Sequence, residues 1–206
     1  MLDRSSFQNK KIIIFDLDGT IVDLDVNWKY LKEILKERYF KIYNQNCDFN
    51  SISECLNNIV EKKDETELLK IFKIVEDFEL KTIDKTQPID EVIYFIQNIK
   101  QIPFIFDTKL AILSLNTRKT IMLALKQFNI FKRFSFIISK EDVRKWKPEP
   151  EGLFKIKSYF NVEIHEIIYF GDKEKDLLTG KNAKIDSYLI YDLIDFINMD
   201  LNYKKI

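Results

Sequence analysis

The feature that most constrains the fold is a short apolar run that ends abruptly in acidic residues. Residues 11–15 read KIIIF, and residues 16–20 read DLDGT. A continuous apolar run, without the alternation of a half-exposed strand, predicts a strand buried on both faces of a parallel sheet. Open α/β sheets bind their ligands outside the carboxyl ends of such strands. The two aspartates, Asp16 and Asp18, are therefore expected at a ligand-binding edge.

From residue 88 onwards, strand-like apolar runs alternate with helical patterns. Pro88 is expected to open a helix, because proline is favoured at the first helical position. Further strands are predicted at 109–115, 134–139, 167–170 and 187–191, and helices at 119–131, 151–160 and 175–183. This alternation predicts a doubly wound parallel sheet covered by helices, a Rossmann-like α/β core.

The stretch between the first strand and residue 88 has no strand signal. One amphipathic helix is predicted over 27–44. A second begins at Ser51, which forms a capping-box pair with Glu54, and a third begins near Asp64. The sequence therefore predicts a discontinuous core, residues 1–22 and 88–206, interrupted by an all-helical domain at 23–87.

Composition argues against several classes of partner. The 206 residues include 33 Lys+Arg and 33 Asp+Glu, whereas nucleic acids and anionic membranes select a basic excess. The N-terminus lacks the apolar stretch of a signal peptide, and no run approaches the ~18 apolar residues of a membrane span. Cys47 and Cys55 would stand about 12 Å apart along a helix, too far for a disulfide. These features predict a cytoplasmic protein with reduced thiols, either monomer or homodimer.

Polar side chains follow four of the predicted strands. Asp16 follows the first strand, Ser114 ends the second, and Asp172 follows the strand at 167–170. Lys147 lies in the loop after the strand at 134–139. Because the carboxyl ends of parallel strands meet at one edge of the sheet, these four groups are expected to converge.

The carboxylates in this set indicate a metal. Asp16 and Asp18, joined by Asp172 and Asp176, make a cluster that is unfavourable unless a cation or proton compensates. Oxygen ligands without His or Cys suit a hard ion, and Mg²⁺ commonly takes a substrate phosphate as a further ligand. The sequence thus predicts a Mg²⁺ site that takes a substrate phosphate as a further ligand.

Other groups near these carboxylates are suited to binding the phosphate. Lys147 would offset the remaining negative charge and hold a phosphoryl oxygen, and Lys145 competes with it for that role. The hydroxyl of Ser114 and the backbone N–H groups around Gly19 and Thr20 are further candidate donors.

Four strings in order carry a resemblance to a known family. Residues 15–23 (FDLDGTIVD), Ser114, Lys147 within KPEP, and residues 171–176 (GDKEKD) resemble the four motifs of the haloacid dehalogenase superfamily in its phosphatase form. The resemblance extends from Lys11 to Tyr191. It implies a Rossmann-like hydrolase similar to the phosphoglycolate phosphatases.

The resemblance also implies a role for each residue. Asp16 would attack phosphorus to give an aspartyl-phosphate, and Asp18 would protonate the leaving oxygen and then deprotonate water. Asp16, Asp172 and the backbone carbonyl of Asp18 would hold Mg²⁺, with Asp176 as a further ligand or a support for the ligands. Asp18 argues against dehalogenation, because a halide leaves without a general acid. The implied enzyme is a Mg²⁺-dependent phosphoric monoester hydrolase.

The chain departs from the family pattern at two positions. Leu115 separates Ser114 from Asn116, whereas many relatives carry Asn directly after the hydroxyl residue, so Asn116 becomes the candidate for a phosphate contact. Lys173 stands where a small hydroxyl residue is common. Its ammonium would either approach the phosphate or point to solvent.

The segment 23–87 resembles a C1-type helical cap, which closes over the site and favours small phosphate esters such as phosphoglycolate or a sugar phosphate. Two alternatives remain open. A phosphomutase of the same superfamily would return the phosphoryl group to a sugar. A non-catalytic regulatory module would only bind metal or phosphate, although a binder has no need of Asp18 as an acid. Taken alone, Asp172 and Asp176 would most simply cap a helix.

Overall fold

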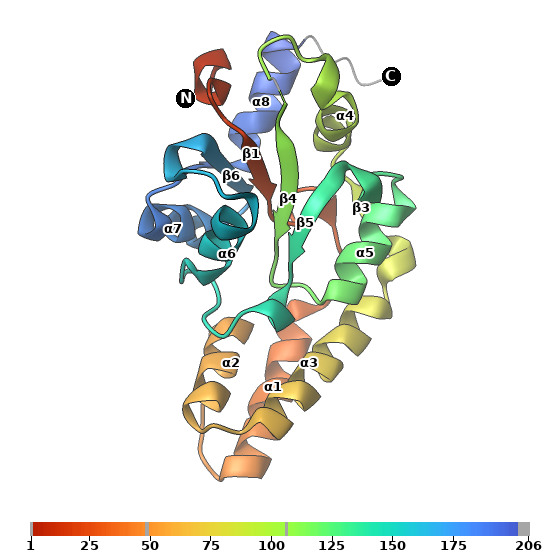
Figure 1. Cartoon of the computed structure of the whole chain (residues 1–206). Helices are drawn as coiled ribbons and strands as arrows, with labels where there is room; N and C mark the ends of the chain where they lie inside the picture. Colours follow the sequence, from red (N-terminus) through yellow and green to blue (C-terminus); the bar gives the residue numbers. More distant parts are fainter. Residues whose placement is uncertain (1, 48–49, 106, 202–206) are drawn as a thin grey trace.

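The chain forms a five-stranded, fully parallel sheet with the strand order β5-β4-β1-β6-β7 (Figure 1). The computed structural model describes residues 2–47, 50–105 and 107–201. The strands are β1 (Ile12–Phe15), β4 (Lys109–Leu113), β5 (Phe134–Ile138), β6 (Ile167–Gly171) and β7 (Asp186–Leu189). The buried run at 11–15 thus lies in the centre of the sheet, and the predicted doubly wound α/β fold is confirmed.

Side chains of β1 alternate between two hydrophobic cores, one on each face of the sheet. Ile13 and Phe15 belong to the core that includes residues of α4 (Asp90–Asn98), α5 (Arg118–Gln127) and α8 (Ile190–Asp200). Ile12 and Ile14 belong to the core that includes residues of α6 (Glu151–Phe160) and α7 (Glu174–Ala183). All four strand side chains are at most 1 % exposed, so burial on both faces explains the unbroken apolar run.

Three helices lie together beyond one end of the sheet (Figure 1). They are α1 (Trp28–Tyr43), α2 (Ile52–Glu61) and α3 (Glu65–Leu80). The start of α2 is capped by Ser51, whose hydroxyl accepts from the N–H of Glu54 at 3.3 Å. Their apolar faces join the core that contains α6 and α7. One direct contact is the edge-to-face pair of Phe72 on α3 and Trp146, with ring centroids 6.3 Å apart.

The chain leaves and re-enters the sheet region at one place. The strands β2 (Val22–Asp23) and β3 (Gln87–Pro88) pair antiparallel, with Val22 opposite Pro88 and Asp23 opposite Gln87. Pro88 was expected to open a helix and instead ends β3, and α4 begins two residues later at Asp90. An edge position of a short strand tolerates proline because it does not need the missing N–H.

Two further predicted boundaries are wrong. The strand predicted at 187–191 ends at Leu189, and α8 begins at Ile190, so the C-terminal helix was missed. The helix predicted at 119–131 ends at Gln127, where Asn129 takes a left-handed φ of 58°. Short 3₁₀ turns connect the elements: η1 (Arg4–Phe7), η2 (Ile83–Lys85), η3 (Ile99–Gln101), η4 (Phe131–Arg133), η5 (Lys140–Asp142) and η6 (Ile164–Glu166).

Both cysteines are free. The expectation that they are spaced along one helix is wrong, because Cys47 lies after α1 ends at Tyr43 and only Cys55 lies in α2. Across the described ranges, every helix is too short or too polar to cross a membrane.

Candidate active site

The register of the sheet brings the predicted strand-end residues together. Phe15 lies between Ile112 of β4 and Phe170 of β6, and the N–H of Asp16 donates to the carbonyl of Phe170 at 2.9 Å. Asp16, Ser114 and Asp172 therefore emerge from three neighbouring strands at their carboxyl ends, as parallel pairing requires.

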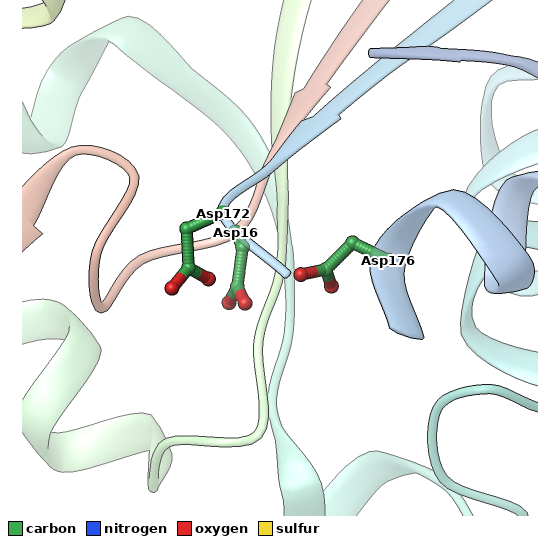
Figure 2. A group of neighbouring side chains, drawn as sticks. All are labelled: Asp16, Asp172 and Asp176. Atoms are coloured by element: carbon green, nitrogen blue, oxygen red, sulfur yellow. The ribbon is translucent and has the colours of Figure 1, made fainter. Parts of the chain in front are cut away.

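Three carboxylates converge at this edge (Figure 2). Asp16, Asp172 and Asp176 each offer an oxygen within 4.8 Å of the others. Figure 2 shows Asp16 and Asp172 side by side after their strands, with Asp176 approaching from the first turn of α7. Three close carboxylates repel one another, so the cluster needs compensating positive charge.

Lys147 supplies part of that charge. Its Nζ lies 2.9 Å from Oδ2 of Asp16 and 2.7 Å from Oδ1 of Asp176, and the residue is 3 % exposed. Burial alone would lower the pKa of this ammonium, but the two carboxylates outweigh it and raise the pKa above its ordinary value. Lys145, the competing candidate, is exposed.

The Asp176 carboxylate is held by three donors. Besides Lys147, it accepts from the hydroxyl of Tyr169 at 2.6 Å and from the N–H of Lys173 at 3.2 Å. Burial works to raise the pKa of Asp176, but the Lys147 ammonium lowers it below its usual range. These contacts suit a carboxylate that positions Lys147.

Asp172 is less completely satisfied. Its Oδ2 lies 3.2 Å from the ammonium of Lys173, while its buried Oδ1 has no hydrogen-bond partner among the described residues. Burial raises the pKa of Asp172, and the neighbouring carboxylate of Asp16 adds to the shift. A buried, unpartnered carboxylate oxygen beside Asp16 fits a hard, oxygen-ligated cation such as Mg²⁺.

Gly19 is required by the close approach of its loop to Asp172. Its φ is +77°, and a Cβ built there would stand 2.4 Å from Oδ2 of Asp172. The loop thus passes the carboxylate at a distance that no side chain permits.

The amide groups of Gly19 and Thr20 are not arranged as the sequence suggested. The N–H of Gly19 donates to the carbonyl of Val22 at 2.8 Å, and that of Thr20 donates to Leu17 at 3.2 Å. Both donors are used within the loop, so they are not free to bind a phosphate. The buried hydroxyl of Thr20 has no partner within the described part of the chain.

The side chain of Asp18 is not part of the three-carboxylate cluster. Its oxygens accept from the N–H of Leu24 at 2.9 Å and from Nε1 of Trp28 at 3.0 Å. Burial raises the pKa of Asp18 to about 6, although these two hydrogen bonds oppose the shift. A carboxyl group with such a pKa can both give and take a proton near neutral pH.

Ser114 and Asn116 belong to a buried hydrogen-bond network. The Ser114 hydroxyl donates to Oδ1 of Asn116 at 2.8 Å, and Nδ2 of Asn116 donates to Glu79 on α3 at 3.1 Å. Glu79 also accepts from the N–H and hydroxyl of Thr117, at 3.0 and 2.6 Å. The Nζ of Lys140 lies 3.4 Å from the same carboxylate. Neither Glu79 nor Lys140 was predicted from the sequence.

A cavity of about 410 Å³ lies between these residues and the helices α1 and α2. Among the predicted residues, Asp16, Asp18, Ser114 and Asn116 line it, while Lys147, Asp172 and Asp176 do not. Sequence reasoning missed several lining residues, which come from α1, from α2 and the residues just before it, and from the segments after β4 and β6: Trp28, Lys32, Asn50, Ser51, Ile52, Ser53, Leu56, Leu115 and Lys175. Lys173, for which the sequence allows either a phosphate contact or a solvated side chain, also lines it.

Burial and the ammonium of Lys147 lower the pKa of Lys175, a half-buried residue beside the cluster. Arg118 and His165 stand outside the site. Arg118 begins α5 and pairs with Asp142 at 2.5 Å, and His165 is exposed.

Comparison with known proteins identifies the family. A sequence model of the haloacid dehalogenase-like hydrolases matches residues 13–190. The pyrophosphatase PpaX of Halalkalibacterium halodurans is 27 % identical over 182 residues, covering 86 % of this chain and 82 % of that protein. The PpaX of Bacillus mycoides is 24 % identical over 173 residues, covering 83 % and 79 %.

Solved structures share the fold. CbbY from Rhodobacter sphaeroides in complex with phosphate superposes with a TM-score of 0.62 at 13 % identity, covering 87 % of this chain and 85 % of that one. A predicted phosphoglycolate phosphatase from Haemophilus somnus gives a TM-score of 0.59 at 16 % identity, covering 88 % and 84 %.

Proposed function

Because the chain belongs to the haloacid dehalogenase-like hydrolase family, we propose that it is a Mg²⁺-dependent phosphatase of small phosphate monoesters. The observation that carries the proposal is the placement of Asp16. Its carboxylate lines the cavity, is ion-paired to buried Lys147, and shares the cavity wall with Asp18, whose pKa is raised to about 6. A nucleophile, a positive charge and an acid thus stand together.

In the first step, a carboxylate oxygen of Asp16 attacks phosphorus, and the bond from phosphorus to the leaving oxygen breaks. Asp18 transfers its proton to that oxygen, which departs as an alcohol. Lys147 holds Asp16 through its ion pair, and its charge opposes the negative charge that accumulates on the phosphoryl oxygens. The product on the enzyme is an aspartyl-phosphate.

In the second step, water attacks phosphorus while the Asp18 carboxylate takes a proton from that water. The bond between phosphorus and Asp16 breaks, which frees phosphate and restores the carboxylate. Leu24 and Trp28 fix the orientation of the Asp18 side chain in both steps. Asp16, Asp172 and the backbone carbonyl of Asp18 would hold Mg²⁺, which supplies charge neutralisation at the phosphoryl group.

We infer further that residues 23–87 are a cap on a core made of residues 1–22 and 88–206. The supporting observation is that Trp28 and Lys32 of α1, together with the start of α2, complete the cavity wall. A cavity of about 410 Å³ fits a small molecule, so this cap would exclude bulky phosphoproteins.

Pyrophosphate is a second candidate substrate. The curated relatives at 24–27 % identity are named pyrophosphatases. The same two steps would apply, with phosphate in place of an alcohol as the leaving group.

The test is phosphate release from p-nitrophenyl phosphate, a panel of small phosphate esters and pyrophosphate. We expect turnover with Mg²⁺, none with a chelator, and a loss of at least about 10⁴-fold in Asp16→Asn, since the nucleophile is removed. Turnover by Asp16→Asn at the wild-type rate would contradict the mechanism. Isomerised sugar phosphate without net phosphate release would indicate a mutase, and biological activity unaffected by Asp18→Asn would indicate a binding module.

A further inference from the structure

The cavity has a second polar wall, which faces it from α1 and α2. Lys32 of α1 lines this wall, together with Ser51, Ile52 and Ser53 at the start of α2. The cavity volume of about 410 Å³ is within the range of sites for whole small molecules. A substrate can therefore reach from Asp16 to this wall.

The start of α2 presents backbone donors there. Ser51 caps the helix and accepts from the N–H of Glu54, but the N–H groups of Ile52 and Ser53 come too early in the helix to have an intrahelical partner. The amino end of a helix also carries partial positive charge. Both properties favour an anion.

A buried hydroxyl stands at the same place without a partner. Ser53 is 5 % exposed, and its Oγ makes no hydrogen bond to any described residue. Buried hydroxyl groups in proteins are nearly always hydrogen-bonded. The unpartnered Oγ of a cavity-lining residue therefore indicates a polar group supplied by a ligand.

Lys32 adds a full positive charge. Its Nζ donates to the backbone carbonyl of Asn50 at 3.3 Å, and no carboxylate within the described residues forms an ion pair with it. Lys173, in contrast, lines the same cavity but is paired with Asp172 at 3.2 Å. Among the residues that the structure describes, Lys32 thus lines the cavity without a carboxylate in ion-pair contact.

We propose that Lys32, the hydroxyl of Ser53 and the first N–H groups of α2 form a distal anion site, which binds a second anionic group of the substrate. The proposal rests on the proposed function, because Asp16 attacks the phosphate at the other end of the cavity. The substrate class is a phosphate compound whose leaving group is itself anionic, through either a second phosphate or a carboxylate.

The experiment compares substrates with and without the second charge. Pyrophosphate and phosphoglycolate carry it, whereas ethyl phosphate and p-nitrophenyl phosphate do not. We expect Lys32→Met to raise KM for one or both of the doubly anionic substrates by about 10- to 100-fold, the range for losing a charged hydrogen bond. Ethyl phosphate and p-nitrophenyl phosphate should keep their kcat/KM within about twofold. Ser53→Ala should show the same selectivity with a smaller change.

A matched control is available on the same helix. Lys29 is exposed and lies outside the cavity wall, so Lys29→Met removes the same charge from α1. Equal effects of Lys29→Met and Lys32→Met, or an equal loss for all four substrates, would overturn the distal site. Which doubly anionic substrate responds to Lys32→Met identifies the second group as phosphate or carboxylate.

Binding without turnover separates this proposal from the proposed function. Calorimetry with the Asp16→Asn variant would compare methylenediphosphonate with methylphosphonate, both resistant to hydrolysis. Tighter binding of the diphosphonate that disappears on adding Lys32→Met supports the distal site, even if the wild-type protein hydrolyses nothing. No preference for the diphosphonate, combined with no preference for phosphonoacetate over methylphosphonate, overturns it.

Discussion

Two lysines of this protein are buried to nearly the same extent but are paired with different numbers of carboxylates. Lys147 is 3 % exposed and contacts two carboxylates, Asp16 and Asp176. Lys140 is 1 % exposed and pairs with one carboxylate, Glu79. The pKa of Lys147 is raised above its ordinary value, whereas burial lowers the pKa of Lys140 and outweighs the opposing charges of Glu79, Glu141 and Glu76.

The groups around the two lysines differ in whether their charges and hydrogen bonds are balanced within the protein. Glu79 is matched by Lys140 and by donors from Asn116 and Thr117, so charge and hydrogen bonding are balanced within the protein. Lys147 faces three clustered carboxylates, Asp16, Asp172 and Asp176, which leaves an excess of negative charge next to the cavity. The Glu79 group, whose charges are balanced, joins α3 to the loop after β4. The group of Asp16, Asp172 and Asp176, whose negative charge is not balanced, is suited to binding a cation and a phosphate.

The largest expected effect separates the two lysines by turnover. Lys147→Met should lower kcat/KM by about 10²–10³-fold, as expected for a group that stabilises developing charge. Lys140→Met should leave kcat/KM within about tenfold, since Lys140 pairs with Glu79 and contacts neither Asp16 nor the other clustered carboxylates. Steady-state kinetics on p-nitrophenyl phosphate would measure both, and similar losses in the two variants would contradict the comparison.

The next effect concerns stability. Glu79→Gln leaves the Lys140 ammonium buried without its counter-charge and should lower the free energy of unfolding by about 3–5 kcal/mol. The double variant Glu79→Gln/Lys140→Met removes both charges and should recover most of that loss. Urea unfolding would measure this, with Asp77→Asn at an exposed position of α3 as control. A double variant no more stable than Glu79→Gln would show that the unpaired Lys140 ammonium does not cause the loss of stability.

A smaller effect should come from the metal. Mg²⁺ at a hundredfold excess over its dissociation constant would stabilise the folded protein by about 2.7 kcal/mol. Asp172→Asn should lose this stabilisation, and Glu79→Gln should keep it, because Glu79 lies outside the carboxylate cluster. Thermal unfolding with and without Mg²⁺ would measure the shift. Equal stabilisation of wild type and Asp172→Asn would place the metal elsewhere.

The smallest effect is a pH dependence. Burial lowers the pKa of folded Lys140 below the ordinary 10.5, so between these two values the unfolded chain binds more protons. Stability contributed by this residue must then rise with pH in that window. Wild type should gain stability relative to Lys140→Met as the pH increases toward 10.5, measured by urea unfolding at several pH values. A constant difference would contradict the lowered pKa.

Much of this arrangement was predictable because its signals are local. An apolar run followed by acidic residues locates a buried strand and its carboxyl end, and alternation after residue 88 predicts the parallel sheet. Once the strands are parallel, Asp16, Ser114 and Asp172 must lie near one another. The sequence therefore predicted the convergence of these groups without information about packing.

The parts that were missed depend on tertiary contacts. Glu79 is one of several acidic residues on α3, and its position resembles that of any exposed helical glutamate, so only the docking of α3 shows that it is 0 % exposed. The N–H groups of Gly19 and Thr20 were predicted as phosphate donors because the hydrogen bonds that turn their loop cannot be read from DLDGT. The wall formed by Lys32 and Ser53 depends on how the helices of residues 23–87 pack against the sheet, which no local pattern specifies.

The antiparallel pair of β2 and β3 makes the insert a separable piece of chain. Val22 faces Pro88 directly, so a two-residue hairpin turn between Asp23 and Gln87 would close the same backbone path. Residues 24–86 therefore form, in the path of the main chain, one long connection between two paired antiparallel strands. The cavity-lining residues of this segment, among them Trp28, Lys32 and Ser53, are therefore all joined to the sheet through a single junction.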